Sequence, residues 1–384
     1  MKNLVFIAFL SLFSVSIQAQ RADFHVIPLP KEIKTTLAAP FELNKQTLIC
    51  YPSSDKELRH NAEFLKQYIS ELTGLELTVT NLPAQQHCIK LTRTLHSKNP
   101  EAYSIRVNSD IVLIEAASAA GSFYGIQTLR KALPTGTAQS IVLPATELKD
   151  YPRFSYRGAH LDVARHFVTP DSVRRFIDIL ALHNINNFHW HLTDDQGWRL
   201  EIKRYPRLTQ IGAQREGTVI GHNSGKYDGQ PYGGYYTQKE VREILKYAAE
   251  RHINVIPEID LPGHMLAALA AYPELGCTGG PYKVWQQWGV SDDVLCAGND
   301  KALEFIDGVL TEVTRLFPSN LIHVGGDECP KTRWKACPKC QARIQALGLK
   351  DNERHTAEQQ LQSYVINHAQ QTLSKLGRQM IGWE

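Results

Sequence analysis

The chain has 384 residues, of which 43% are hydrophobic and 21% are charged, and this composition is typical of a globular protein. At roughly 150 residues per domain, the length predicts two or three domains and a sizeable buried core. The formal net charge is only +3 and no run of Lys or Arg forms a basic patch. These features exclude a nucleic-acid partner and argue against a polyanionic substrate.

Residues 1–19 have the pattern of a secretory signal peptide. Lys2 precedes an apolar run over 4–17, and cleavage is expected after Ala19. The run is too short and wrongly flanked for a membrane span, and no later segment approaches eighteen uninterrupted apolar residues. We therefore expect an exported protein, periplasmic or secreted, without a membrane span.

Export makes the seven cysteines candidates for disulfides, although an odd count leaves one thiol unpaired within a chain. Cys277 and Cys296 bracket a Gly/Pro-rich loop and form a possible disulfide. Cys329, Cys337 and Cys340 crowd one further loop. A zinc site there would need a fourth ligand, and no residue has convincing spacing. The interpretation is a structural disulfide beside a spare thiol, with no metal and no cofactor.

Residues 20–150 are predicted to form a small α+β domain. Its expected strands cover 47–50, 75–80, 88–92, 103–107 and 111–116. Two helices are expected over 57–73 and 119–133. No cluster of catalytic residue types occurs in this part, so a structural or interface role is expected.

From residue 151 to 384 strands alternate with helices. The predicted strands cover 157–163, 187–192, 253–260, 321–327 and 379–383. Helix starts are marked by Thr169-Pro170 and by a capping box over 237–240. This alternation predicts a parallel sheet with crossover helices.

Polar residues gather where each predicted strand ends. The strand ends carry Asp162 and Arg165; Asp194 and Asp195; Glu258, Asp260 and His264; Asp327 and Glu328; Trp383 and Glu384. A doubly wound sheet would concentrate its site at one switch point, whereas a (β/α)₈ TIM barrel collects chemistry from many strand ends. The pattern therefore favours the barrel.

Four segments, 156–167, 189–199, 256–264 and 323–328, resemble in order and spacing the sequential motifs of family 20 glycoside hydrolases. Segment 121–129 is similar to the end of that family's small N-terminal domain. The resemblance implies an exo-acting, retaining β-N-acetylhexosaminidase that removes terminal non-reducing β-GlcNAc or GalNAc. It extends from about residue 27 to the last residue.

The adjacent acids Asp327 and Glu328 carry the implied catalysis. Consecutive side chains on an extended strand point to opposite sides, which suits them poorly as an opposed acid and nucleophile. The resemblance implies instead that the 2-acetamido group of the sugar attacks, with Glu328 as general acid and base and Asp327 orienting the acetamido N–H. An acidic N-cap or a calcium-binding edge is the alternative for an Asp-Glu pair alone.

The resemblance assigns further residues to the substrate. Arg165 corresponds to the arginine that grips sugar hydroxyls, although a salt bridge to Asp162 is the alternative. Asp194 corresponds to the carboxylate that supports the acid and base. Trp383 corresponds to an indole in the pocket wall.

His264 corresponds to a supporting histidine linked with Asp260, and both residues could be purely structural. His189 and His191 form a His-x-His pair on one strand face. Such a pair could hold metal in an amidohydrolase barrel, but buried hydrogen-bonded histidines are favoured.

A closed barrel needs eight strands and five are predicted here, so the sequence is expected to be a fragment of a longer product or a broken enzyme. The second function hypothesis is accordingly a catalytically impaired carbohydrate-binding fragment. Expected ligands are oligosaccharides or glycoconjugates that end in N-acetylhexosamine. The sequence leaves open the natural polymer, the GlcNAc or GalNAc preference and the oligomeric state.

Overall fold

The computed structural model describes residues 20–383, so the predicted signal peptide of residues 1–19 lies outside the described residues. The chain divides into two compact units, the second of which begins at Phe154. No helix within residues 20–383 has the length and apolar character needed to cross a bilayer.

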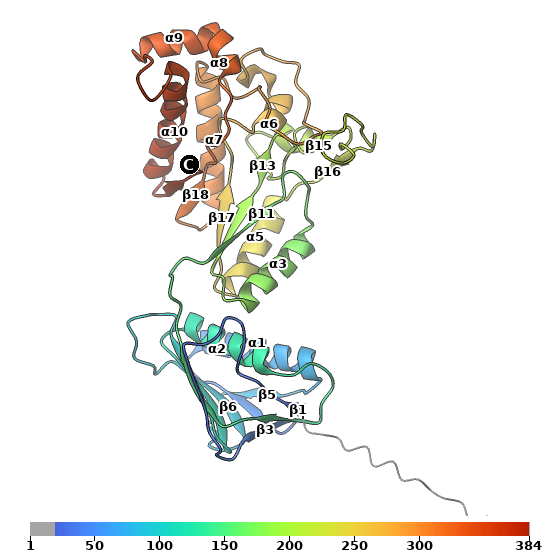
Figure 1. Ribbon diagram of the computed structural model, residues 1–384, viewed down its shortest axis with the longest axis vertical. Coiled ribbons are helices and arrows are strands. Elements are labelled where there is room, and N and C mark those ends of the chain that lie inside the picture. Colours follow the sequence, from blue (N-terminus) through green and yellow to red (C-terminus); the bar gives the residue numbers. More distant parts are fainter. Residues whose placement is uncertain (1–19, 384) are drawn as a thin grey trace, which may run out of the picture. The chain divides into compact units, whose positions relative to one another are not determined.

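The N-terminal unit contains a seven-stranded sheet with the strand order β2-β10-β7-β8-β6-β4-β5. Its strands are β2 (Glu32–Thr35), β4 (Leu48–Cys50), β5 (Thr78–Thr80), β6 (Cys88–Thr92), β7 (Tyr103–Val107), β8 (Ile111–Ala116) and β10 (Thr146–Asp150). A second sheet is formed by β1 (Gln20–Arg21), β9 (Ser140–Leu143) and β3 (Phe41–Asn44). Both helices of the unit, α1 (Lys56–Thr73) and α2 (Ala119–Ala132), lie on one face of the larger sheet (Figure 1).

The α1 helix shows why the local sequence predicts this unit well. Asp55 caps its N-terminus by accepting the Leu58 N–H, and Gly74 ends it at a φ of 72°. One face buries apolar side chains against the sheet. The strand expected over 75–80 begins only at Thr78, because only residues 78–80 pair with β4.

The second unit is built on five parallel strands in the order β11-β12-β17-β18-β19. These are β11 (Gly158–Asp162), β12 (Asn187–His191), β17 (Asn254–Glu258), β18 (Leu321–His323) and β19 (Gln379–Ile381). The helices that follow the first four strands in the chain include α3 (Pro170–Leu182), α5 (Gln238–Ala249), α7 (Asp300–Leu316) and α10 (Ala357–Lys375). Each strand pairs with its successor in the chain, which is the order of a (β/α)₈ barrel, and the predicted fold class is confirmed.

The loops at the strand ends contain short elements. They are α4 (Arg207–Gln210), α6 (Leu266–Ala271), η1 (Pro273–Leu275), α8 (Thr332–Ala336), α9 (Pro338–Ala346), the pair β13 (Thr193–Asp194) and β14 (Gly197–Trp198), and the pair β15 (Gln214–Arg215) and β16 (Tyr232–Gly233). The predicted helix starts are present: Thr169 caps α3 ahead of Pro170, and Thr237 and Glu240 form both bonds of a capping box on α5.

Candidate active site

The register of the parallel sheet brings polar side chains from neighbouring strands into one row. Asp162 of β11 is paired with His191 of β12, His191 with Glu258 of β17, and Glu258 with His323 of β18. Paired residues in adjacent strands point to the same face of a sheet. The strand ends thus form a continuous polar layer.

Glu258 lies at the centre of this layer, fully buried among histidines. Its Oε2 is 2.7 Å from His189 Nε2 and 2.7 Å from His191 Nδ1, and its Oε1 is 3.1 Å from His323 Nδ1. Burial opposes its ionisation, but hydrogen bonds from these histidines and His160 hold the pKa of Glu258 well below its usual value. We call these five residues the Glu258 cluster.

The histidines of the Glu258 cluster differ in charge. Burial lowers the pKa of His189. Burial also acts against protonation of His191, but its hydrogen bonds to Asp194 and Glu258 raise its pKa to about 10. The His189-x-His191 pair is therefore engaged by carboxylates, as favoured from the sequence.

Asp194 is buried and contacts three cationic side chains. Its Oδ2 is 2.9 Å from His191 Nε2 and 2.7 Å from Arg165 Nη2, and its Oδ1 is 3.2 Å from His264 Nδ1. Burial opposes its charge, but the bonds from His191 and His264 lower the pKa of Asp194. Asp194 thus links the histidine layer to the loops above the strands.

His264 carries this connection to the two predicted catalytic acids. Its Nδ1 faces Asp194, while its Nε2 lies 3.5 Å from Glu328 Oε2 and 4.0 Å from Asp327 Oδ2. Burial would lower its pKa, but hydrogen bonds to Asp194 and Asp195 raise the pKa of His264 to about 11. A protonated His264 therefore stands behind Glu328.

The expected link between His264 and Asp260 is electrostatic, since the charge of His264 acts on Asp260 while the hydrogen bonds of His264 go to Asp194 and Asp195. Asp260 Oδ1 accepts the Gly326 N–H at 3.3 Å. Burial raises the pKa of Asp260 well above its usual value, and the charge on Asp327 adds to this rise. Asp260 thus supports the turn that carries Asp327.

The turn itself differs from the sequence prediction, which extended the strand to Asp327. β18 ends at His323, because Gly325 and Gly326 adopt φ values of 63° and 98°. A Cβ on Gly325 would lie 1.7 Å from Asp260 Oδ1, so only glycine fits there. Asp327 and Glu328 therefore leave the strand on a sharp turn and need not point to opposite sides.

Glu328 is held in an uncommon backbone conformation at the end of this turn. Its φ is 44°, a region that side-chain-bearing residues seldom occupy outside functional sites. Its side chain is 60% exposed and that of Asp327 is 29% exposed. The two acids are thus open to a ligand, unlike the buried carboxylates beneath them.

Arg165 joins this network through Asp194. Its guanidinium bonds Asp162 Oδ2 at 3.0 Å as well as Asp194, so the alternative salt bridge to Asp162 is present. Arg165 also lines a small pocket whose other lining residues are His166, Gln196, Arg215, Thr218, Val219, Gln286, Gln287 and Trp288.

Trp383 lies just beyond β19 and packs on the Glu258 cluster. Its ring centroid is 4.6 Å from that of His323, and its Nε1–H donates to Glu258 Oε1 at 2.8 Å. Its backbone N–H donates to the Gly325 carbonyl at 2.8 Å. Trp383 is 45% exposed and lies beside the turn that carries Asp327 and Glu328.

Sequence reasoning missed the central position of Glu258 and the participation of His160 and His323. Each lies within a predicted strand, and the signal was the shared register of those strands. Strand register is set by pairing, which one strand's sequence does not reveal.

The possible disulfide between Cys277 and Cys296 is not formed in the structure, where all seven cysteines are free. The sequence offers no fourth ligand of convincing spacing for Cys329, Cys337 and Cys340, but the structure brings Cys277 and Cys296 beside the last two. Cys277, Cys296, Cys337 and Cys340 converge so that all their sulfurs lie within 4.8 Å of one another. The contact arises between two separate loops, which spacing along the chain does not show.

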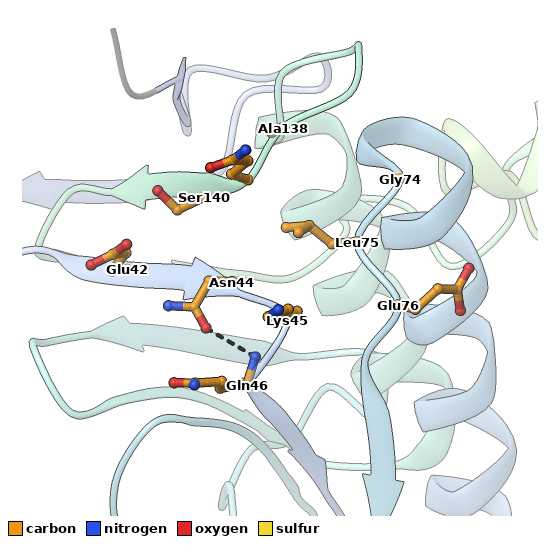
Figure 2. Close-up of a pocket in the computed structure, with 10 residues that line it drawn as sticks. Glu42, Asn44, Lys45, Gln46, Gly74, Leu75, Glu76, Ala138 and Ser140 are labelled. Carbon is orange, nitrogen blue, oxygen red and sulfur yellow. Dashed lines mark hydrogen bonds between the residues drawn. The ribbon is translucent and has the colours of Figure 1, made fainter. Parts of the chain in front are cut away.

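A larger hollow lies in the N-terminal unit. Figure 2 shows its lining, where Asn44 accepts the Gln46 N–H at 3.0 Å and thereby holds its own turn. Its lining includes Glu42, Lys45 and Glu76 but no histidine or cysteine. The residues suited to acid–base chemistry are those at the barrel's strand ends.

The sheet order and the polar strand ends define a (β/α)-barrel domain with a carboxylate-rich site of the kind that glycoside hydrolases carry. A family model described as "Glycosyl hydrolase family 20, catalytic domain" matches residues 154–384, and one described as "Glycosyl hydrolase family 20, domain 2" matches 23–151. The chain belongs to glycosyl hydrolase family 20.

Similar proteins of known structure or name support this family assignment. A β-hexosaminidase of Porphyromonas gingivalis is 43% identical, with 100% of this chain and 50% of that protein covered. The exo-β-N-acetylglucosaminidase structure from Vibrio harveyi with N-acetylglucosamine is 33% identical at a TM-score of 0.81, covering 96% of this chain and 56% of that one. The β-N-acetylhexosaminidase of Streptomyces coelicolor A3(2) is 33% identical at a TM-score of 0.78, with 94% and 66% covered. The chain thus spans about half the length of the curated relatives it matches.

Proposed function

We propose that the protein is an exo-acting, retaining β-N-acetylhexosaminidase that hydrolyses terminal, non-reducing β-GlcNAc or GalNAc residues. The observation that carries the proposal is the turn at 325–328, which presents Asp327 and Glu328 side by side and open, backed by His264 and Asp194. A relative of this chain is named N,N'-diacetylchitobiase, in keeping with a substrate that ends in N-acetylhexosamine.

The proposed reaction uses the sugar's own acetamido group as nucleophile, and family 20 is a recognised exception to the two-carboxylate scheme of glycosidases. In the first step, Glu328 gives its proton to the glycosidic oxygen as the acetamido oxygen bonds the anomeric carbon and the leaving group departs. In the second step, water attacks that carbon, Glu328 takes a proton from the water, and the acetamido group is released. Two displacements at one carbon retain the configuration.

The residues around the acids have distinct parts in this scheme. Asp327 accepts the acetamido N–H and steadies the positive charge of the cyclic intermediate. Arg165 offers donors to sugar hydroxyls, and Trp383 provides an apolar wall. His264, cationic through Asp194, is a positioning residue for Glu328. An attacking group inside the substrate can remove up to about 7–11 kcal/mol of barrier in favourable cases.

The test compares two substrates on the purified protein. A chromogenic N-acetyl-β-glucosaminide should be cleaved, and the matching β-glucoside without the acetamido group should react slower by orders of magnitude. Proton NMR of the first product formed should show the β-anomer. Equal rates on both substrates, or an α-anomer, would contradict the scheme. Sugar binding without turnover would favour the carbohydrate-binding alternative.

We also propose export of the protein, on the signal-peptide pattern of residues 1–19. N-terminal sequencing of the protein recovered from the periplasm or medium should begin at Gln20. Recovery from the cytoplasm with Met1 or Lys2 at its start would oppose this.

A further inference from the structure

Four cysteines from two separate loops meet at one point in the second unit. Cys277 and Cys296 enclose one loop, and Cys337 and Cys340 begin α9. The Sγ separations are 3.8 Å for Cys277–Cys340, 3.7 Å for Cys296–Cys337 and 3.7 Å for Cys296–Cys340. The Sγ atoms of the remaining three pairs also lie within 4.8 Å of each other.

These separations match a metal tetrathiolate. In a tetrahedral site with Zn–S bonds of about 2.3 Å, the sulfurs stand about 3.8 Å apart, whereas a disulfide requires about 2.05 Å. The contacts are also shared, since Cys296 has two sulfur neighbours at 3.7 Å. Shared contacts at this spacing suit a central ion better than any one pair of disulfides.

The backbone around the cysteines forms a compact cradle. The Cys296 N–H donates to the Leu275 carbonyl at 2.8 Å beside the bridge between Gly276 and Leu295, which holds Cys277 next to Cys296. Cys337-Pro-Lys-Cys340 has the two-residue spacing found in zinc-binding loops. Cys337 stands at the N-cap of α9, where the helix dipole favours a thiolate.

Gly298 lets the two loops approach closely. A Cβ there would lie 2.1 Å from the Lys339 carbonyl carbon, so no other residue fits without a shift.

The surroundings indicate a closed, structural site. Cys296, Cys337 and Cys340 are buried, and only Cys277 is partly exposed. Trp334 is fully buried and donates its Nε1–H to the carbonyl of Leu295, the residue before Cys296, at 2.9 Å. Four protein ligands leave no position for substrate.

We propose that Cys277, Cys296, Cys337 and Cys340 bind one Zn²⁺ ion as a structural tetrathiolate. On binding, each thiol releases its proton to solvent as its sulfur bonds the metal, and no oxidation state changes.

The ion would hold together two loops that border the candidate active site. The loop between Cys277 and Cys296 reaches Asp195, whose backbone carbonyl accepts the Trp285 N–H at 2.9 Å and whose Oδ2 accepts the Ser291 N–H at 3.3 Å. The other loop runs directly from Glu328 to Cys337. Zinc thus connects the loop after β17 to the one after β18.

The test is metal analysis of the full chain, purified without reductant or chelator. Mass spectrometry of the elements should find one zinc per chain, and X-ray absorption should find four sulfur neighbours at about 2.3 Å. Replacement by Co²⁺ should give the visible absorption of a tetrahedral thiolate complex. These readouts do not depend on glycosidase activity.

Cysteine variants distinguish a bound ion from disulfides. Cys296→Ala should lose the zinc, whereas Cys277→His should keep it, because imidazole can bind zinc but cannot form a disulfide. Cys88→Ala is the matched control, a buried cysteine in the N-terminal unit that should leave the zinc content unchanged.

Two results would overturn the proposal. One is a metal-free protein whose mass rises by four hydrogens on reduction and whose four cysteines are found in disulfides. The other is a protein with free thiols that takes up no Zn²⁺, or that holds iron in its place.

Discussion

Glu258 and Glu328 come from the ends of neighbouring strands, yet the protein gives them opposite environments. Glu258 is fully buried and surrounded by His160, His189, His191 and His323. Glu328 is 60% exposed, and its nearest charged partner given by the structure is His264 Nε2 at 3.5 Å. One carboxylate is enclosed by four histidines and the other is left open.

Residue type alone therefore does not assign a catalytic role to a glutamate. A carboxylate that must gain and lose a proton needs room for a ligand and few fixed donors. A carboxylate held by four histidines stays ionised and stabilises the layer on which the site is built. We therefore expect substitutions at Glu328 to change rate and substitutions at Glu258 to change stability.

The Glu328→Gln variant tests the open carboxylate and should have the largest effect. Loss of the general acid should lower kcat by roughly 10²–10⁴-fold, while the free energy of unfolding should change by less than about 0.5 kcal/mol. Steady-state kinetics and urea titration measure the two quantities. Glu353→Gln, at an exposed position, is the control. An unchanged kcat would reject the assigned role.

The Glu258→Gln variant tests the buried carboxylate. Removing its charge leaves the histidine layer without its shared partner, and we expect a loss of about 3–5 kcal/mol in the free energy of unfolding. Urea denaturation followed by tryptophan fluorescence would show it. A stability equal to that of the wild type would mean that the Glu258 cluster does not hold the layer together.

The Gly325→Ala variant tests the turn that separates the two glutamates. Gly325 and Gly348 both have a φ of 63°, but only at Gly325 would a Cβ strike another group, namely Asp260. Gly348→Ala should cost about 1–2 kcal/mol from backbone strain alone. Gly325→Ala should cost more and should also lower kcat. Equal losses of stability in the two variants would show that a Cβ beside Asp260 does not change the free energy of unfolding.

The charge of His264 predicts a pH effect on stability. Its pKa is about 11 in the folded protein and about 6.5 when unfolded, so the folded state binds more protons between these values. Its contribution is complete below about pH 6.5 and is lost as the pH rises through about 11, by no more than about 1.4 kcal/mol per pH unit.

The Asp194→Asn variant sharpens this prediction, because Asp194 is a main cause of the raised pKa. The difference in unfolding free energy between wild type and variant should be largest near neutral pH and should shrink as the pH approaches 11. Urea titrations over this range measure it, with Asp171→Asn, on the exposed start of α3, as control. A difference that stays constant with pH would mean that Asp194 does not raise the pKa of His264.

Much of the fold follows from local sequence. The helices α1, α3 and α5 begin at capping residues that the sequence displays, and the strand–helix alternation is enough to predict a barrel. The glycines before Asp327 and Glu328 mark a turn, but the strand was expected to continue through them. The prediction was wrong there because Gly325 adopts a left-handed φ where its backbone lies against Asp260, 65 positions earlier, and leaves no room for a Cβ.

Local sequence patterns predict which elements form, in which order, and which two acids follow β18. The packing of the folded chain sets what surrounds these elements: histidines from three strands around Glu258, Asp194 behind His264, and four cysteines from two loops at one point. The reason is physical. Periodicity and capping act within a few residues, whereas strand register and loop packing bring together side chains that no local pattern connects.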